Sequence, residues 1–155
     1  MRTETVTRKI QYAALPWRSS PMGVEILLIT TLNTRRWIVP KGWPVDGLAP
    51  HQSAAQEALE EAGISGKIEI GAIGSFHYEK LRKSGEKVSC TVDVFPMRVE
   101  LQRKRWMEKG ARELCWCSVT EALTRVREPG LRRLIARFGA AHGYVAKKTA
   151  VAARA

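Results

Sequence analysis

Three glutamates, Glu57, Glu60 and Glu61, lie within about one helical turn of each other and could together bind a hard cation. Mg²⁺ takes one or two carboxylates from a protein and completes its shell with waters and substrate phosphates, so a further carboxylate would be left to act as a base. As plain structure the arrangement is unfavourable, because like charges repel at these spacings and the helix dipole disfavours negative charge near a C-terminus. A solvated acidic face is the alternative interpretation. Because the sequence keeps these glutamates despite the unfavourable charge arrangement, we favour a functional site.

The helix that positions these glutamates is predicted to run from Pro50 to Ala62. Proline suits a first helical position, and Gly63 suits the left-handed residue just past a helix end. We expect the glutamates on roughly the opposite face from the apolar residues. The apolar face consists of Ala54, Ala55, Ala58, Leu59 and Ala62.

The stretch 42–64 resembles the Nudix box, G-x5-E-x7-R-E-U-x-E-E-x-G-U, where U is a bulky aliphatic residue. The matching positions are Gly42, Glu57, Glu60, Glu61, Gly63 and Ile64. The preceding segment, 37–42, resembles the W-x-x-P-K-G sequence of the branch that includes diphosphoinositol-polyphosphate and diadenosine-polyphosphate hydrolases. This resemblance implies an α+β Nudix fold, an α/β/α sandwich with a mixed β-sheet and a central catalytic helix.

The resemblance also implies the site residues and the cofactor. The implied catalytic residues are Glu57, Glu60 and Glu61, and the implied metal site consists of these three and Gly42. Mg²⁺ is the expected metal, with Mn²⁺ as the alternative. Two positions depart from the box: Leu48 replaces its first glutamate, and Gln56 replaces the arginine that is thought to orient the neighbouring glutamate. These departures bear on catalytic efficiency rather than on metal binding.

The chain is strongly basic, with 26 Lys+Arg against 15 Asp+Glu and a formal charge of +11. Such a field concentrates nucleic acid, anionic membrane surfaces or phosphorylated small molecules. Lys41, at the mouth of the glutamate helix, and Arg35 and Arg36, in the preceding turn, are the expected phosphate-binding residues. The basic residues of the loop 102–112 are expected to be mostly a solvated face.

Two residues in that loop are less ordinary. Trp106 either stacks on a base or anchors the loop to the core. Glu108 is a candidate for an additional metal ligand or base.

The three cysteines are too few, and odd in number, for a disulfide framework. Cys115 and Cys117 flank Trp116 on one predicted strand, but two residues alone do not make a zinc site. We expect the cysteines to pack in a reducing cytosol. No apolar run has the length of a secretory or membrane-spanning segment, so we expect a cytoplasmic protein that does not contact membranes.

At 155 residues the chain fits one domain, predicted over 1–145 with a frayed tail at 146–155. The remaining helical region is predicted over 119–141, interrupted at Pro129-Gly130. The predicted strands or strand-containing segments are 3–18, 23–31, 37–40, 67–80, 88–99 and 113–118.

The combined prediction is a Mg²⁺-dependent pyrophosphohydrolase acting on a phosphate-rich nucleoside diphosphate linked to another moiety. Diadenosine polyphosphates and diphosphoinositol polyphosphates are the leading substrates. One alternative is a catalytically weak Nudix-fold module that binds nucleotide or RNA. The other is a general RNA-binding protein that uses the basic loop, with RNA ranked below a small molecule as partner. The sequence gives no indication of the oligomeric state.

Overall fold

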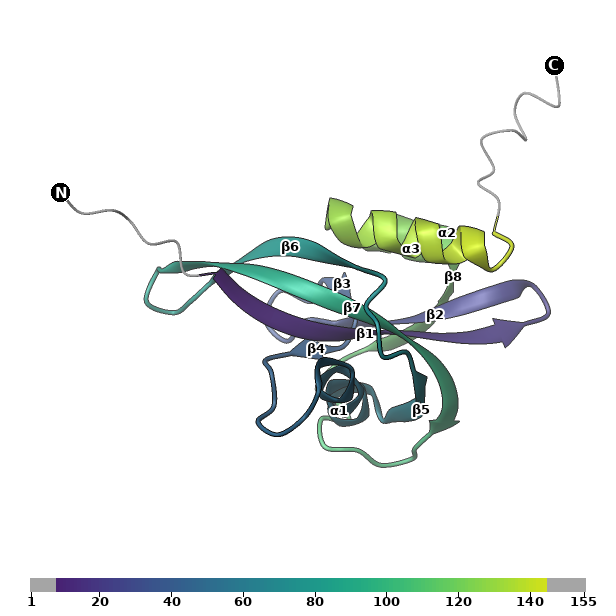
Figure 1. The fold of residues 1–155 in the computed structure, drawn as a ribbon, viewed down its shortest axis with the longest axis horizontal. Coiled ribbons are helices and arrows are strands. Elements are labelled where there is room, and N and C mark those ends of the chain that lie inside the picture. The colour runs from purple at the N-terminus through teal and green to yellow at the C-terminus, as the bar shows by residue number, and fades with distance from the viewer. Residues whose placement is uncertain (1–7, 145–155) are drawn as a thin grey trace, which may run out of the picture.

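The computed structural model describes residues 8–144, in which one mixed sheet carries helices on both faces (Figure 1). The strands are β1 Arg8–Ser20, β2 Gly23–Thr30, β3 Trp37–Ile38, β4 Lys41–Gly42, β5 Ile64–Ile68, β6 Gly74–Leu81, β7 Lys87–Gln102 and β8 Leu114–Ser118. The helices are α1 Pro50–Ala62, α2 Val119–Arg125 and α3 Pro129–Ala141. Figure 1 shows α1 on one face and α2 and α3 on the other, which confirms the predicted α/β/α sandwich.

The predicted domain end at residue 145 and the tail 146–155 lie outside the described residues. Between residues 8 and 144, no helix is long and apolar enough to cross a membrane.

β1 lies at the centre of the sheet, whose strand order is β3-β2-β1-β7-β5. It runs parallel to β7 and antiparallel to β2 and β4, while β6 pairs with β7 and β8 pairs with β2. Residues 13–15 of β1 and 26–29 of β2 are fully buried, as expected for strands covered on both faces.

The predicted strand 37–40 ends at Ile38, and the predicted strand 3–18 continues to Ser20, with its residues 3–7 outside the described part of the chain. Two further strand predictions also differ from the structure. β7 is longer than predicted because different parts of it pair with β1, β5 and β6. The predicted segment 67–80 is two strands: β5 begins at Ile64, directly after the helix cap, and β6 begins at Gly74.

Helix α1 has the predicted bounds, and local chemistry fixes both ends. At the N-terminus, the Ala49 N–H donates to Gln52 Oε1 at 2.8 Å, and Pro50 needs no hydrogen bond for its nitrogen. At the C-terminus, Gly63 adopts the left-handed conformation with φ 67°, and its N–H donates to the Leu59 carbonyl at 3.0 Å. A Cβ on Gly63 would overlap the Trp106 ring, so Trp106 anchors the β7–β8 loop to the end of this helix.

The prediction that all three glutamates face away from the core is wrong for Glu61. This side chain is buried on the same side of α1 as Ala54 and Ala58, while Leu59 is only half-buried. The reason is that α1 packs against β1 and β4 as well as β5, and β4 provides a backbone N–H for the Glu61 carboxylate.

Replacing Gly63 by alanine tests the contact between the helix end and Trp106. Gly47 also has a left-handed φ of 83°, but a Cβ there meets no atom within 4 Å. We expect Gly47→Ala to lower the free energy of unfolding by about 1–2 kcal/mol, the backbone cost alone. Gly63→Ala should cost a further 1–3 kcal/mol, roughly, because the Trp106 ring must move. Equal losses in urea denaturation would show that Trp106 does not anchor the loop.

Candidate active site

A hollow of about 580 Å³ lies where β4, α1, β6 and the β7–β8 loop meet. Helix α1 contributes Glu57 and Glu61 to its wall, and β4 contributes Lys41 and Gly42. With Arg36, which also lines the hollow, the structure brings together five of the residues predicted for catalysis, metal binding and phosphate binding.

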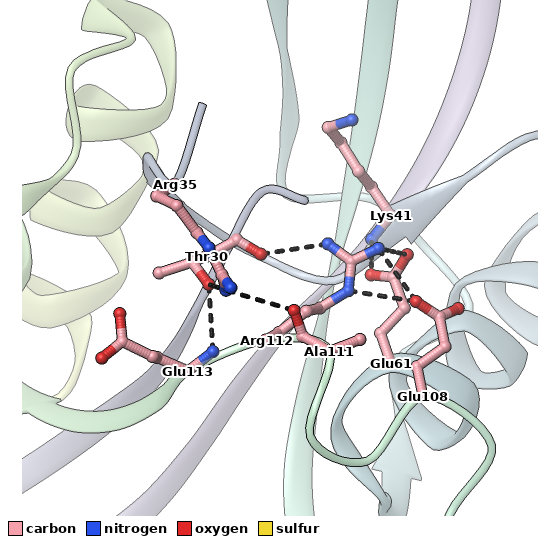
Figure 2. Close-up of polar contacts among 8 residues, drawn as sticks. All are labelled: Thr30, Arg35, Lys41, Glu61, Glu108, Ala111, Arg112 and Glu113. Carbon is pink, nitrogen blue, oxygen red and sulfur yellow. Dashed lines mark hydrogen bonds and ion pairs between the residues drawn. The ribbon is translucent and has the colours of Figure 1, made fainter. Parts of the chain in front are cut away.

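Glu61 is held at the base of this hollow and is 7% exposed. Its Oε1 accepts a hydrogen bond from the backbone N–H of Lys41 at 3.1 Å, and its Oε2 accepts one from Nη2 of Arg112 at 3.2 Å (Figure 2). Burial raises the pKa of the Glu61 carboxyl to about 8, a larger effect than the lowering by Arg112. Burial therefore disfavours the charged carboxylate, while the Arg112 guanidinium and the Lys41 N–H favour it.

Arg112 is the main site residue that the sequence did not identify. Its guanidinium points inward from the β7–β8 loop and is 11% exposed, so its expected place on a solvated basic face is wrong. Besides Glu61, it donates to the Thr30 carbonyl at 3.0 Å and to Glu108 Oε1 at 3.1 and 3.2 Å. The uncharged Gln56 signalled that the buried carboxylates needed a cation from elsewhere, but nothing in the sequence distinguished Arg112 from the other basic residues of the loop.

Glu57 is half-buried and faces the same hollow, where Arg112 and Lys41 act on its charge without contacting it. Within residues 8–144, its carboxylate has no hydrogen bond or ion pair. It lies directly against Gly42, where a Cβ would overlap the carboxylate. Burial, and to a smaller extent the charges of Glu60 and Glu108, raise the pKa of Glu57 to about 7. Gly42 thus makes room for a carboxylate that lacks a protein partner.

Glu60 contributes to this cluster from its border. Its side chain is outside the lining of the hollow, although its charge acts on Glu57. Its backbone carbonyl accepts the Glu108 N–H at 3.0 Å, which attaches the β7–β8 loop to the last turn of α1.

Lys41 points into the hollow and is the first member of a hydrogen-bonded chain. Its Nζ donates to the Tyr78 hydroxyl at 2.9 Å, and that hydroxyl donates to Gln11 Oε1 at 2.6 Å. Burial lowers the pKa of Lys41, and nearby Glu61 offsets part of this effect. Tyr78 and Gln11 were missed because each is one strand residue among many, and only the pairing of β1, β6 and β7 brings them to Lys41.

The two predicted phosphate-binding arginines lie at the edge of this region. Arg36 borders the hollow and pairs with Glu128 at 3.6 Å. Arg35, with φ 53°, donates to the Ala111 carbonyl at 3.1 Å (Figure 2). Arg35 lines a second hollow of about 570 Å³ that it shares with Arg36, Arg125 and Arg127. Lys41 and Arg36 thus line the hollow that contains the carboxylates, whereas Arg35 lines the neighbouring hollow.

Comparison with known proteins agrees with this architecture. The model of the NUDIX domain matches residues 17–138. The chain is 27% identical over 118 residues to "Nudix hydrolase 12, mitochondrial" of Arabidopsis thaliana, a match that covers 74% of this chain and 58% of that protein. It thus spans about three-fifths of the length of this curated relative.

Two solved structures share the fold. The C. elegans Ap4A hydrolase has a TM-score of 0.62 at 19% identity, over 86% of this chain and 98% of that chain. The NUDIX domain of Shewanella oneidensis NrtR complexed with ADP ribose has a TM-score of 0.63 at 13% identity, over 85% and 88%. The family match covers most of the chain and includes α1 and β4, which carry the carboxylates and Lys41, so this chain belongs to the NUDIX domain family.

Proposed function

We propose that the protein is a divalent-metal-dependent Nudix hydrolase that cleaves a phosphoanhydride bond in a phosphate-rich substrate. The observation that carries this proposal is the presence of Glu57, Glu61 and Lys41 on one hollow of a NUDIX domain. Nudix hydrolases generally use divalent metal ions. We propose Mg²⁺ as the metal, with Mn²⁺ as the alternative.

The donor groups of the hollow fit a hard cation. They are carboxylate oxygens, which Mg²⁺ prefers, and Glu57 lacks a partner among the described residues. The residues proposed to hold the cation are Glu57, Glu60, Glu61 and the backbone of Gly42. A bound cation would neutralise charge on the phosphates and lower the pKa of a water bound to it.

The protein groups would divide the remaining work. Lys41 would bind substrate phosphate, because it lines the hollow and its Nζ donates to the uncharged Tyr78 hydroxyl rather than to a carboxylate. Glu57 has a pKa near neutrality and no fixed partner, so it is the carboxylate placed to accept a proton from the attacking water. Arg112 would keep Glu61 in position.

The rim of the hollow suggests the substrate class. Trp43 is exposed there, and Lys80 Nζ lies 5.4 Å from its ring centroid, which suits stacking on a base beside phosphates. The fold shared with an Ap4A hydrolase and an ADP ribose complex makes diadenosine tetraphosphate and ADP-ribose the first substrates to test. Diphosphoinositol polyphosphates follow because the charge of +11 attracts polyanions.

Glutamine at position 57 or 61 tests the metal assignment. Either substitution keeps the side-chain shape and removes the charge that Mg²⁺ requires. We expect kcat on diadenosine tetraphosphate to fall by about 100-fold or more, and the Mg²⁺-induced rise in Tm to shrink. Glu69→Gln, exposed just after β5 and outside the lining of the hollow, is the control and should retain both properties. Mutants with wild-type turnover and the full Mg²⁺ shift would exclude this site, whereas nucleotide binding by a wild type without turnover would favour the weakly catalytic module.

The raised pKa values predict how pH affects the metal-free protein. An unfolded carboxyl titrates near 4.5, whereas Glu57 and Glu61 titrate at about 7 and about 8 when folded. Between these values the native state binds more protons than the unfolded state, so stability falls as pH rises. We expect Tm in a chelator to fall from about pH 5 to about pH 8, more steeply for the wild type than for Glu61→Gln. Parallel curves for the two proteins would contradict the shift at Glu61.

Arg112 variants test its positioning role. Arg112→Ala leaves the Thr30 carbonyl and two carboxylates without their donor, so stability should fall by about 1–3 kcal/mol per acceptor left unsatisfied. We expect kcat to fall as well, because Glu61 loses its partner. Arg112→Lys should recover part of this kcat, although a lysine cannot contact the Thr30 carbonyl and both carboxylates at once. Arg105→Ala, exposed in the same loop, is the matched control. A rise in KM with unchanged kcat in Arg112→Ala would show that Arg112 binds substrate instead of holding Glu61.

A further inference from the structure

We propose that Cys115, Cys117 and Glu121 form a binding site for a soft divalent cation of the Zn²⁺ class. The site lies between β8 and α2. Helices α1 and α2 cover opposite faces of the sheet, so the proposed site is separate from the carboxylate hollow (Figure 1).

The three side chains converge through local structure. Cys115 and Cys117 are two residues apart on β8 and therefore point to the same side, with their sulfurs 3.2 Å apart. The Ser118 hydroxyl accepts the Glu121 N–H at 3.1 Å and starts α2, which places Glu121 one helical turn beyond the strand. One ligand atom from each of the three residues lies within 4.8 Å of the others.

These distances suit a thiolate site. With Zn–S bonds of about 2.3 Å, two sulfurs in a tetrahedral site lie roughly 3.8 Å apart. The two cysteine sulfurs therefore need to separate only slightly. Cys115 and Glu121 are partly exposed, so a cation can enter from the solvent side and a water can take the fourth position.

The local charges balance when the site is loaded. Two thiolates and one carboxylate carry three negative charges, and the cation and one arginine carry three positive charges. Arg125 supplies the last of these: its Nη2 donates to Glu121 Oε2 at 3.0 Å, and its charge acts on both sulfurs. The second carboxylate oxygen of Glu121 is left to bind the cation.

The chemistry of the donors separates this site from the hollow. Soft thiolates select Zn²⁺ or Cd²⁺, whereas Mg²⁺ prefers an oxygen shell. Without a cation, burial raises the pKa of the fully buried Cys117 thiol, and the contact with Cys115 raises it further. Cation binding would replace the two thiol protons and release them to solvent.

The test is a titration of the reduced 155-residue protein with CdCl₂ alone. We expect sulfur-to-cadmium charge-transfer absorption that saturates at one cation per chain, and displacement of Cd²⁺ by Zn²⁺ but not by excess Mg²⁺. Cys115→Ser should abolish the absorption change, and Glu121→Gln should weaken Cd²⁺ binding by about 100-fold, at least as much as loss of an outer-shell partner. Since Cys115 is partly exposed, its serine variant is expected to fold, which far-UV circular dichroism checks.

Two matched controls locate the signal. Cys90, on β7, is the third cysteine, and Glu25 is an ion-paired glutamate on β2. Cys90→Ala and Glu25→Gln should bind Cd²⁺ like the wild type. Loss of the absorption in Cys90→Ala, its persistence in Cys115→Ser, displacement by Mg²⁺, or no Cd²⁺ binding by the reduced wild type would each overturn the proposal.

Discussion

The buried carboxylate of Glu61 is the constraint on which the rest of the site depends. One oxygen is held by the backbone of β4 and the other by Arg112 of the β7–β8 loop, so a single side chain fixes three segments that are distant in sequence. A buried carboxylate without such partners would be costly, and replacing it by an apolar residue would remove the reason for the other contacts. The polar contacts of Glu61 therefore link α1, β4 and the loop in addition to the apolar packing between them.

Much of the architecture could be predicted because its signals are local. Pro50 and Gly63 mark the ends of α1 by backbone chemistry alone, and the apolar run in β2 indicates a strand covered on both faces. The length of β7 and the order of the strands could not be predicted. They depend on pairing between distant segments, above all of β1 with β7, which no short pattern encodes.

The same distinction holds within the site. Glu57 and Glu61 could be predicted because they lie four residues apart on one helix, and Lys41 because it directly precedes Gly42 at the mouth of that helix. Arg112, Tyr78 and Gln11 could not, because they join the site through tertiary contacts alone. The inward turn of Glu61 was also missed, since helical periodicity defines which residues share a face but not what a neighbouring strand offers to that face.

The parallel pairing of β1 with β7 also bears on how the protein forms during synthesis. Residues 8–17 of β1 lie beside residues 89–98 of β7, so the middle of the sheet joins segments about 80 residues apart. Closing so long a loop costs chain entropy before the contacts repay it, which makes such pairings slow. A nascent chain that ends before β7 contains α1 and β2, but it lacks the strand that pairs with the other side of β1. The acidic helix therefore emerges early, and its counter-charge, Arg112, is added only once most of the domain has been translated.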